Sequence, residues 1–103
     1  LCDVDARGCS HNVCDGIERV TPSRWPRPAS GTWEVRVALW PTAQLFAPGH
    51  RIRVQVASGA HPRFARNLGT GEPIATATET RPANLAVHHD PAHPSAVTLS
   101  VAP

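Results

Sequence analysis

The segment Trp33-Glu34-Val35-Arg36-Val37-Ala38-Leu39 (residues 33–39) decides the fold class of this sequence. Large apolar side chains occupy every second position, and charged side chains stand between them in its first half. Side chains alternate between the two faces of a β-strand, so this spacing predicts a strand with one packed face and one solvated face. Strands of this kind are typical of antiparallel sheets.

Segments 51–56 and 97–101 repeat the alternation, and segments 12–20 and 85–89 are weaker candidates for strands. The 11 prolines and 7 glycines interrupt the chain so often that no helical stripe of apolar residues persists. Ala47-Pro48-Gly49 predicts a tight turn, because Pro presets the second turn position and Gly accepts positive φ at the third. The predicted class is all-β, an antiparallel β-sandwich of about five strands.

Length and composition limit the function classes. The 103 residues suffice for one domain and are too few for two. Hydrophobic residues make up 41% and charged residues 17%, which is typical of a globular chain. The net charge of +2 is too small to indicate nucleic-acid binding, and no run approaches the roughly 20 apolar residues of a membrane span. A soluble single domain, cytoplasmic or secreted, is expected.

The predicted strands are too few to close a two-sheet sandwich. A jelly roll has about eight strands, so about five leave sheet edges unpaired and an inner face uncovered. An uncovered apolar face of that size is unusual for a free monomer. The remaining strands are therefore expected upstream in the same protein or in a second copy of this chain.

Three separated segments carry family motifs. Segment 39–67 reads LWPTAQLFAPGHRIRVQVASGAHPRFARN, segment 3–17 contains Asp-Val, Asn-Val and Asp-Gly-Ile, and segment 87–95 reads VHHDPAHPS. Their order over nearly the whole chain resembles the C-terminal domain of the X-Pro dipeptidyl-peptidase, cocaine esterase and α-amino-acid ester hydrolase family.

The resemblance implies a galactose-binding-like jelly roll to which this chain contributes the later strands. It also implies an upstream α/β-hydrolase domain that carries a Ser-His-Asp triad, while this chain is non-catalytic and frames that domain. No cofactor and no metal are expected. The residues expected to form structural motifs or interdomain contacts are Trp40, Gly49, His50, Arg51, Pro62, Arg63, Phe64, Asn67, His89, Asp90, His93, Pro94 and Ser95.

The residues themselves give no sign of a catalytic centre. A Gly-x-Ser-x-Gly nucleophile elbow is absent from the sequence. A stand-alone module that completes its sandwich by dimerisation is the main alternative. A third alternative is carbohydrate binding by displayed Trp25 and Trp40, since alternation places Trp33 on the packed face.

Two groups of residues have the composition of metal ligands. His88, His89, Asp90 and His93 are close in sequence, but neighbouring residues such as His88 and His89 point to opposite faces of a strand. A structural turn is favoured there, with Asp90 accepting backbone N–H groups. Cys2, Cys9 and Cys14 lack the Cys-x-x-Cys spacing of structural zinc sites, and one disulfide or three reduced thiols both remain open.

The segment 62–67 places two arginines around an aromatic ring. A local role has Phe64 filling the end of the sandwich while Arg63 and Asn67 satisfy loop carbonyls. The alternative is contact with a neighbouring domain, for which guanidinium and aromatic groups are well suited.

Overall fold

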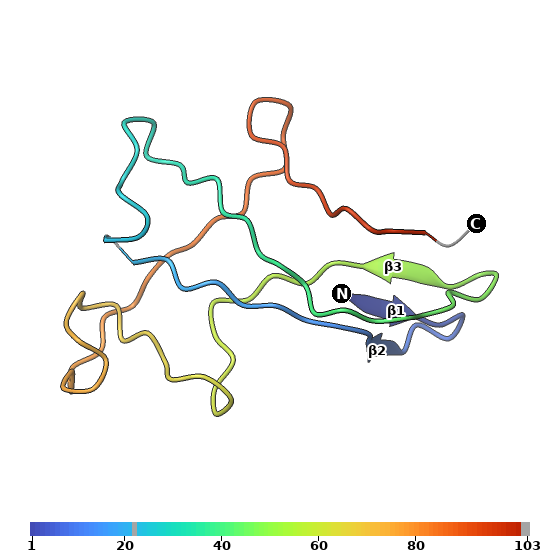
Figure 1. Cartoon of the computed structure of the whole chain (residues 1–103), viewed down its shortest axis with the longest axis horizontal. Helices are drawn as coiled ribbons and strands as arrows, with labels where there is room; N and C mark the ends of the chain where they lie inside the picture. Colours follow the sequence, from blue (N-terminus) through green and yellow to red (C-terminus); the bar gives the residue numbers. More distant parts are fainter. Residues whose placement is uncertain (22, 102–103) are drawn as a thin grey trace. The chain divides into compact units, whose positions relative to one another are not determined.

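The computed structural model describes residues 1–21 and 23–101, and within these ranges it is all-β. Three short strands, β1 (Cys2–Val4), β2 (Ser10–Asn12) and β3 (Arg51–Arg53), form one sheet of order β2-β1-β3. β1 lies in the middle and pairs antiparallel with both neighbours (Figure 1). The described residues contain no helix that is long and apolar enough to cross a membrane.

The buried side chains gather on the central strand. Cys2, Asp3 and Val4 are all buried, and Val4 is only 1% exposed. Hydrogen bonds to β2 and β3 satisfy the backbone of β1 on both edges, which allows the strand to leave water. Cys14 is also buried, and the N-terminal ammonium donates to its carbonyl at 2.8 Å. This small cluster is the packed centre of the described chain.

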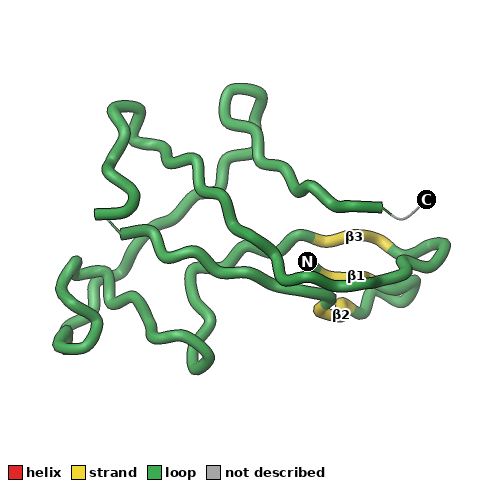
Figure 2. Tube along the Cα trace, viewed as in Figure 1, coloured by secondary structure: helices red, strands yellow, loops and turns green. Residues whose placement is uncertain are grey.

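The described chain divides into two compact units. The first, Leu1–Gln55, contains the whole three-stranded sheet. The second begins at Val56 and consists of turns and irregular segments, with a single β-bridge between Asp90 and His93 among its described residues. Figure 2 shows the strand colour confined to the first unit.

Most of the predicted strands lack a hydrogen-bonded partner in the structure. Segments 33–39, 85–89 and 97–101 form no ladder, segment 51–56 is a strand only as far as Arg53, and segment 12–20 contributes only Asn12 to β2. A strand is defined by its bonds to a neighbour, and the alternation of side chains does not supply that neighbour. The strand prediction was therefore too long and missed β1.

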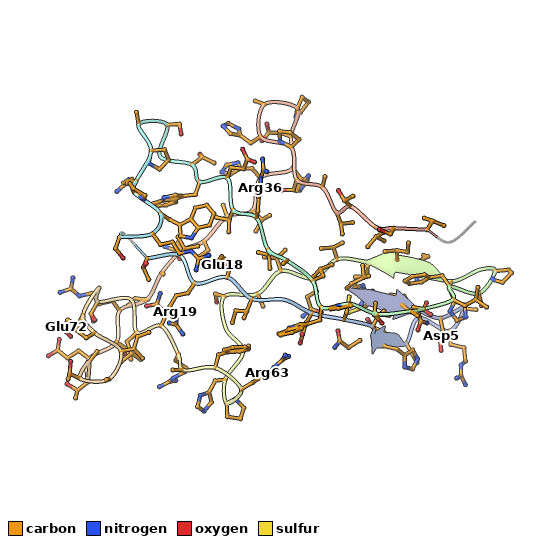
Figure 3. The ribbon with its side chains drawn as sticks, viewed as in Figure 1. Asp5, Glu18, Arg19, Arg36, Arg63 and Glu72 are labelled. Carbon is orange, nitrogen blue, oxygen red and sulfur yellow. The ribbon has the colours of Figure 1, made fainter. Side chains whose placement is uncertain are left out.

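The side chains of segment 33–39 nevertheless alternate between a polar and an apolar face. On the polar face, Arg36 donates to Glu34 at 3.0 Å, and Figure 3 labels this arginine. On the other face, Trp33 is 40% exposed, although alternation predicted a packed position, and Val35 and Val37 are exposed as well. The apolar face is present, but the described residues cover it only in part.

The turn at Ala47-Pro48-Gly49 is confirmed. The backbone N–H of His50 donates to the Ala47 carbonyl at 3.0 Å, and Gly49 has a φ of 82°. A positive φ of this size costs a residue with a Cβ energy that Gly avoids. The turn leads directly into β3 and so fixes the position of His50 against β1.

Candidate functional site

Asp3 forms the most buried polar cluster of the described chain. Its Oδ1 lies 2.9 Å from Nδ1 of His50, and its Oδ2 accepts a bond from Nε2 of Gln44 at 3.2 Å. A buried carboxylate needs such partners, because an unsatisfied charge in the protein interior is costly. An imidazole and an amide group satisfy the carboxylate. The cluster therefore fastens the turn before β3 onto β1.

A second aspartate organises the loop between β1 and β2. Asp5 Oδ1 accepts the backbone N–H groups of Arg7 at 2.9 Å and of Cys9 at 2.8 Å. The N–H of Cys9, with further help from Arg7 and the His11 ring, lowers the pKa of the Asp5 carboxyl below its ordinary value of 3.8, against the opposing effect of desolvation. Gly8 completes the turn with a φ of 90° (Figure 3 labels Asp5).

In the second unit, Asp90 builds a turn in the way the sequence predicts. Its Oδ1 accepts the backbone N–H groups of Ala92 at 2.9 Å and of His93 at 3.0 Å. The N–H of His93 is the main cause that lowers the pKa of the Asp90 carboxyl below its ordinary value. The Ser95 hydroxyl donates to the His88 carbonyl and ties the two limbs of the turn together.

The same turn brings two imidazoles together. The ring centroids of His88 and His93 are 5.2 Å apart, and the Nδ1 atoms lie 3.7 and 3.5 Å from Asp90 carboxylate oxygens. The sequence analysis grouped these residues and predicted the turn from Pro91 and Pro94, but it considered chelation only by the adjacent pair of His88 and His89. The structure pairs His88 with His93 across the turn.

The segment around Phe64 is stabilised locally. The backbone N–H of Phe64 donates to the Ala60 carbonyl at 3.0 Å, and the Arg63 guanidinium lies 5.4 Å from the Phe64 ring centroid. Phe64 is only half-buried, and Asn67 accepts the backbone N–H of Gly69 at 3.0 Å through its side-chain oxygen. Asn67 thus satisfies a loop donor, whereas a loop carbonyl was expected as its partner. The side chain of Arg63 extends from the loop in Figure 3.

The three tryptophans do not form a common platform. Trp40 is 62% exposed, as expected, and together with Ile17, Ala38 and Leu39 it lines a shallow hollow of about 240 Å³. Trp33 donates through Nε1 to the carbonyls of Trp25 and Pro26, and Trp25 is half-buried. Of the two tryptophans that were expected to stack on carbohydrate, Trp40 is therefore well exposed and Trp25 is not.

The remaining predicted site residues lie on the surface of their own units. This applies to Arg51 in β3 and to Pro62, His89 and Pro94 in the second unit, all of which are exposed. Sequence reasoning did not single out Asp3 and Gln44 as partners of His50. Only the pairing of β1 with β3 brings residues so distant in sequence together.

The three cysteines are free thiols in the structure. Cys2 and Cys14 are buried and pack as small apolar groups, while Cys9 is exposed. Of the two states that the sequence left open, the structure has the reduced one.

Comparisons with known proteins found one matching family model and a similar esterase. Residues 1–98 match the family model of the X-Pro dipeptidyl-peptidase C-terminal non-catalytic domain. The chain is 36% identical over 110 aligned residues to a cocaine esterase from Rhodococcus sp. (strain MB1 Bresler). That alignment covers 98% of this chain but 19% of the length of the esterase. No solved structure was found to match the chain.

The match to the family model extends over nearly the whole chain and includes all three motif segments as well as the Asp3–His50 pair. The chain therefore belongs to the family of C-terminal non-catalytic domains of X-Pro dipeptidyl-peptidases.

Proposed function

We propose that this chain supplies the later strands of a galactose-binding-like jelly roll that packs on an upstream α/β-hydrolase domain of the same protein. The hydrolase domain carries the Ser-His-Asp triad and cleaves X-Pro peptides or esters, and this single domain frames its active site. The family match and the esterase relative support a parent protein of this kind. The chain itself makes no bond-breaking contribution.

The observation that carries the proposal is the incompletely covered apolar face of segment 33–39. Its four alternating apolar residues, Trp33, Val35, Val37 and Leu39, are each between 36% and 44% exposed. Complete burial of a Val or Leu side chain contributes roughly 1.5–3 kcal/mol, and this face gains the full contribution when another segment covers it. Upstream strands of the same domain are the natural cover, because the alternation continues the pattern of a sandwich interior.

Trp40 is the residue best placed to contact the catalytic domain. It follows Leu39 directly in the sequence, is well exposed, and borders the shallow apolar hollow with Ile17 and Leu39. Exposed tryptophans beside apolar pockets are enriched at the centres of protein interfaces. In the second unit, the Phe64 ring with the Arg63 guanidinium over it offers another aromatic contact surface.

The test compares two substitutions in the full-length protein. Val37→Asp introduces a charge on the apolar face, and Arg36→Asp introduces the same charge on the neighbouring polar face. If upstream strands cover the apolar face, Val37→Asp lowers the free energy of unfolding by more than about 2 kcal/mol, whereas Arg36→Asp changes it by about 0.5 kcal/mol, as loss of a surface ion pair does. Equal, small effects of the two substitutions contradict the proposal.

Association of two copies is the second candidate, and one observation favours it. In the three-stranded sheet, β2 and β3 each have one edge that no described strand pairs. Such edges accept a strand from another chain. Sedimentation of the full-length protein separates the two: a concentration-independent monomer excludes the dimer, and a dimer disrupted by proline substitution at Ile52 in β3 supports it.

A further inference from the structure

The turn from His88 to Ser95 brings together three side chains with the chemistry of metal ligands. One ligand atom each from His88, Asp90 and His93 lies within 4.8 Å of the others. All three side chains are about half exposed, so a cation and its water have free access. Two imidazoles and a carboxylate form the donor set of many sites for divalent first-row transition metals.

Asp90 is already oriented for such a role. Its Oδ1 is held by the backbone N–H groups of Ala92 and His93, while Oδ2 is the oxygen nearest to Nδ1 of His88, at 3.7 Å. In metal sites, ligating carboxylates and imidazoles are themselves fixed by hydrogen bonds to a second set of groups. The turn supplies that second set with its own backbone and leaves Oδ2 near His88, while Nδ1 of His93 lies 3.5 Å from Oδ1.

The distances fit a site that closes by side-chain rotation alone. Zinc binds nitrogen and oxygen at about 2.0–2.2 Å, so its ligand atoms lie a little over 3 Å from one another in a tetrahedral site. Nδ1 of His88 lies 3.7 Å from Asp90 Oδ2 and Nδ1 of His93 lies 3.5 Å from Oδ1, and one ligand atom from each residue lies within 4.8 Å of the others. Forming the site therefore requires the ligand atoms to approach by up to about 1.5 Å. Exposed rings make such movements freely, and Pro91 and Pro94 keep the backbone of the turn rigid.

We propose that His88, Asp90 and His93 bind a divalent transition-metal ion, with Zn²⁺ as the best-fitting cation and water in the fourth position. The site clamps the two limbs of the turn, adding to the bond from the Ser95 hydroxyl to the His88 carbonyl. His89 is not part of the group of residues whose ligand atoms lie within 4.8 Å of one another, so it is expected to take no part. This site is independent of the hydrolase activity proposed above.

Titration of the full-length protein with ZnCl₂, followed by calorimetry, tests the proposal. The expected result is a binding step with a dissociation constant in the micromolar range, which is ordinary for an exposed three-ligand site and corresponds to about 8 kcal/mol. The variant H88A/H93A is expected to weaken this step at least tenfold. His89→Ala removes the same ring one residue away from His88 and is expected to leave the step unchanged.

Asp90→Asn separates ligation from folding. An Asn side-chain oxygen still accepts the N–H groups of Ala92 and His93, so the turn persists while the negative ligand is lost. Weakened zinc binding, with an unfolding midpoint in the absence of metal lowered no more than in Asp5→Asn, supports the site. Unchanged zinc binding in Asp90→Asn and in H88A/H93A overturns it, as does an equal loss in His89→Ala.

The absorption spectrum of bound Co²⁺ distinguishes metal binding at this site from metal binding by the free thiols. Binding by imidazole and carboxylate gives visible bands without the near-ultraviolet charge-transfer band of a cobalt–thiolate bond. A micromolar cobalt complex that has the thiolate band, and that survives H88A/H93A, assigns the metal to the cysteines and overturns the proposal.

Discussion

Nδ1 of His50 lies 2.9 Å from Oδ1 of Asp3, although 47 residues separate the two in sequence. Asp3 is at the centre of β1 and opposite Ile52 of β3, so the pair ties the strand to the turn that precedes its partner. Because the Asp3 side chain is only 8% exposed, the loss of either partner leaves a polar group without compensation in the protein interior.

Replacement of His50 is therefore expected to destabilise the domain. His50→Ala leaves Asp3 Oδ1 without its side-chain partner, and the free energy of unfolding is expected to fall by about 1–3 kcal/mol. His50→Gln restores a donor and is expected to recover part of the loss. Urea denaturation of the full-length protein, monitored by tryptophan fluorescence to which this chain contributes three residues, measures both.

His11→Ala is the matched control for this prediction. His11 lies on β2, the other neighbour of β1, but its side chain is 66% exposed and 3.8 Å from Asp5. Exposed pairs of this kind contribute little, about 0–1 kcal/mol. A loss in His11→Ala as large as in His50→Ala contradicts the importance assigned to the Asp3–His50 pair.

The loop between β1 and β2 is expected to weaken in acid through Asp5. Backbone N–H groups of Cys9 and Arg7 lower the pKa of this carboxyl in the folded protein. A group with a lowered folded pKa contributes stability above its unfolded pKa, here near 3.8, and that contribution disappears as the pH falls through the folded pKa.

Asp5→Asn isolates this contribution, because its amide oxygen accepts the same N–H groups without a charge. The difference in unfolding midpoint between the parent protein and Asp5→Asn is expected to favour the parent at pH 6 and to shrink steadily below pH 4. Thermal unfolding of both proteins at several pH values between 2 and 6 measures this difference. A difference that stays constant down to pH 2 contradicts it.

The turn at Gly49 allows a test that is free of steric contacts. Gly49 has a φ of 82°, and a Cβ added there meets no atom within 4 Å. Gly49→Ala is therefore expected to cost about 1–2 kcal/mol through backbone strain alone, and Gly49→Asn less. Gly59→Ala is the control, since Gly59 also faces open space but without the positive φ, and thermal unfolding compares the three variants. Equal midpoints for Gly49→Ala and Gly59→Ala contradict the prediction.

Local chemistry explains which features the sequence predicts correctly. The turn at Gly49 and the turn at Asp90 depend on residues within four positions, and both are present. Strand length depends on partners, and segment 33–39 has the right alternation without a neighbour to form a ladder. β1 was missed because three residues are too few to display a period, and its burial comes from the strands on either side.

In the candidate site too, the sequence predicts local features and misses contacts between distant residues. His50 was identified through its motif, but its partners Asp3 and Gln44 depend on a pairing of distant strands that no local pattern encodes. The His88–His93 pair was within reach of sequence reasoning, since a proline-stiffened turn reverses the chain between them. The turn and the grouping of His88 with His93 were predicted, but the 5.2 Å distance between their ring centroids depends on the path of that turn, which the sequence does not give.

Gly16 marks a close approach between two segments that lack a regular ladder. The N–H of Trp40 donates to the Asp15 carbonyl at 2.9 Å, which draws the two segments together. A Cβ added at Gly16 would lie far inside van der Waals contact with the carbonyl oxygen of Ala38. Because that oxygen belongs to the backbone, rotation of a side chain cannot relieve the clash.

Gly16→Ala is therefore expected to force the two segments apart and to lower the free energy of unfolding by about 1–3 kcal/mol, as overpacking does. The shift also moves Trp40, so its fluorescence in the native state is expected to change together with the unfolding midpoint. Gly59→Ala again supplies the control, because its added methyl group meets open space. A Gly16→Ala protein with native fluorescence and the midpoint of Gly59→Ala contradicts the close approach, since no arrangement that keeps Gly16 against Ala38 has room for the methyl group.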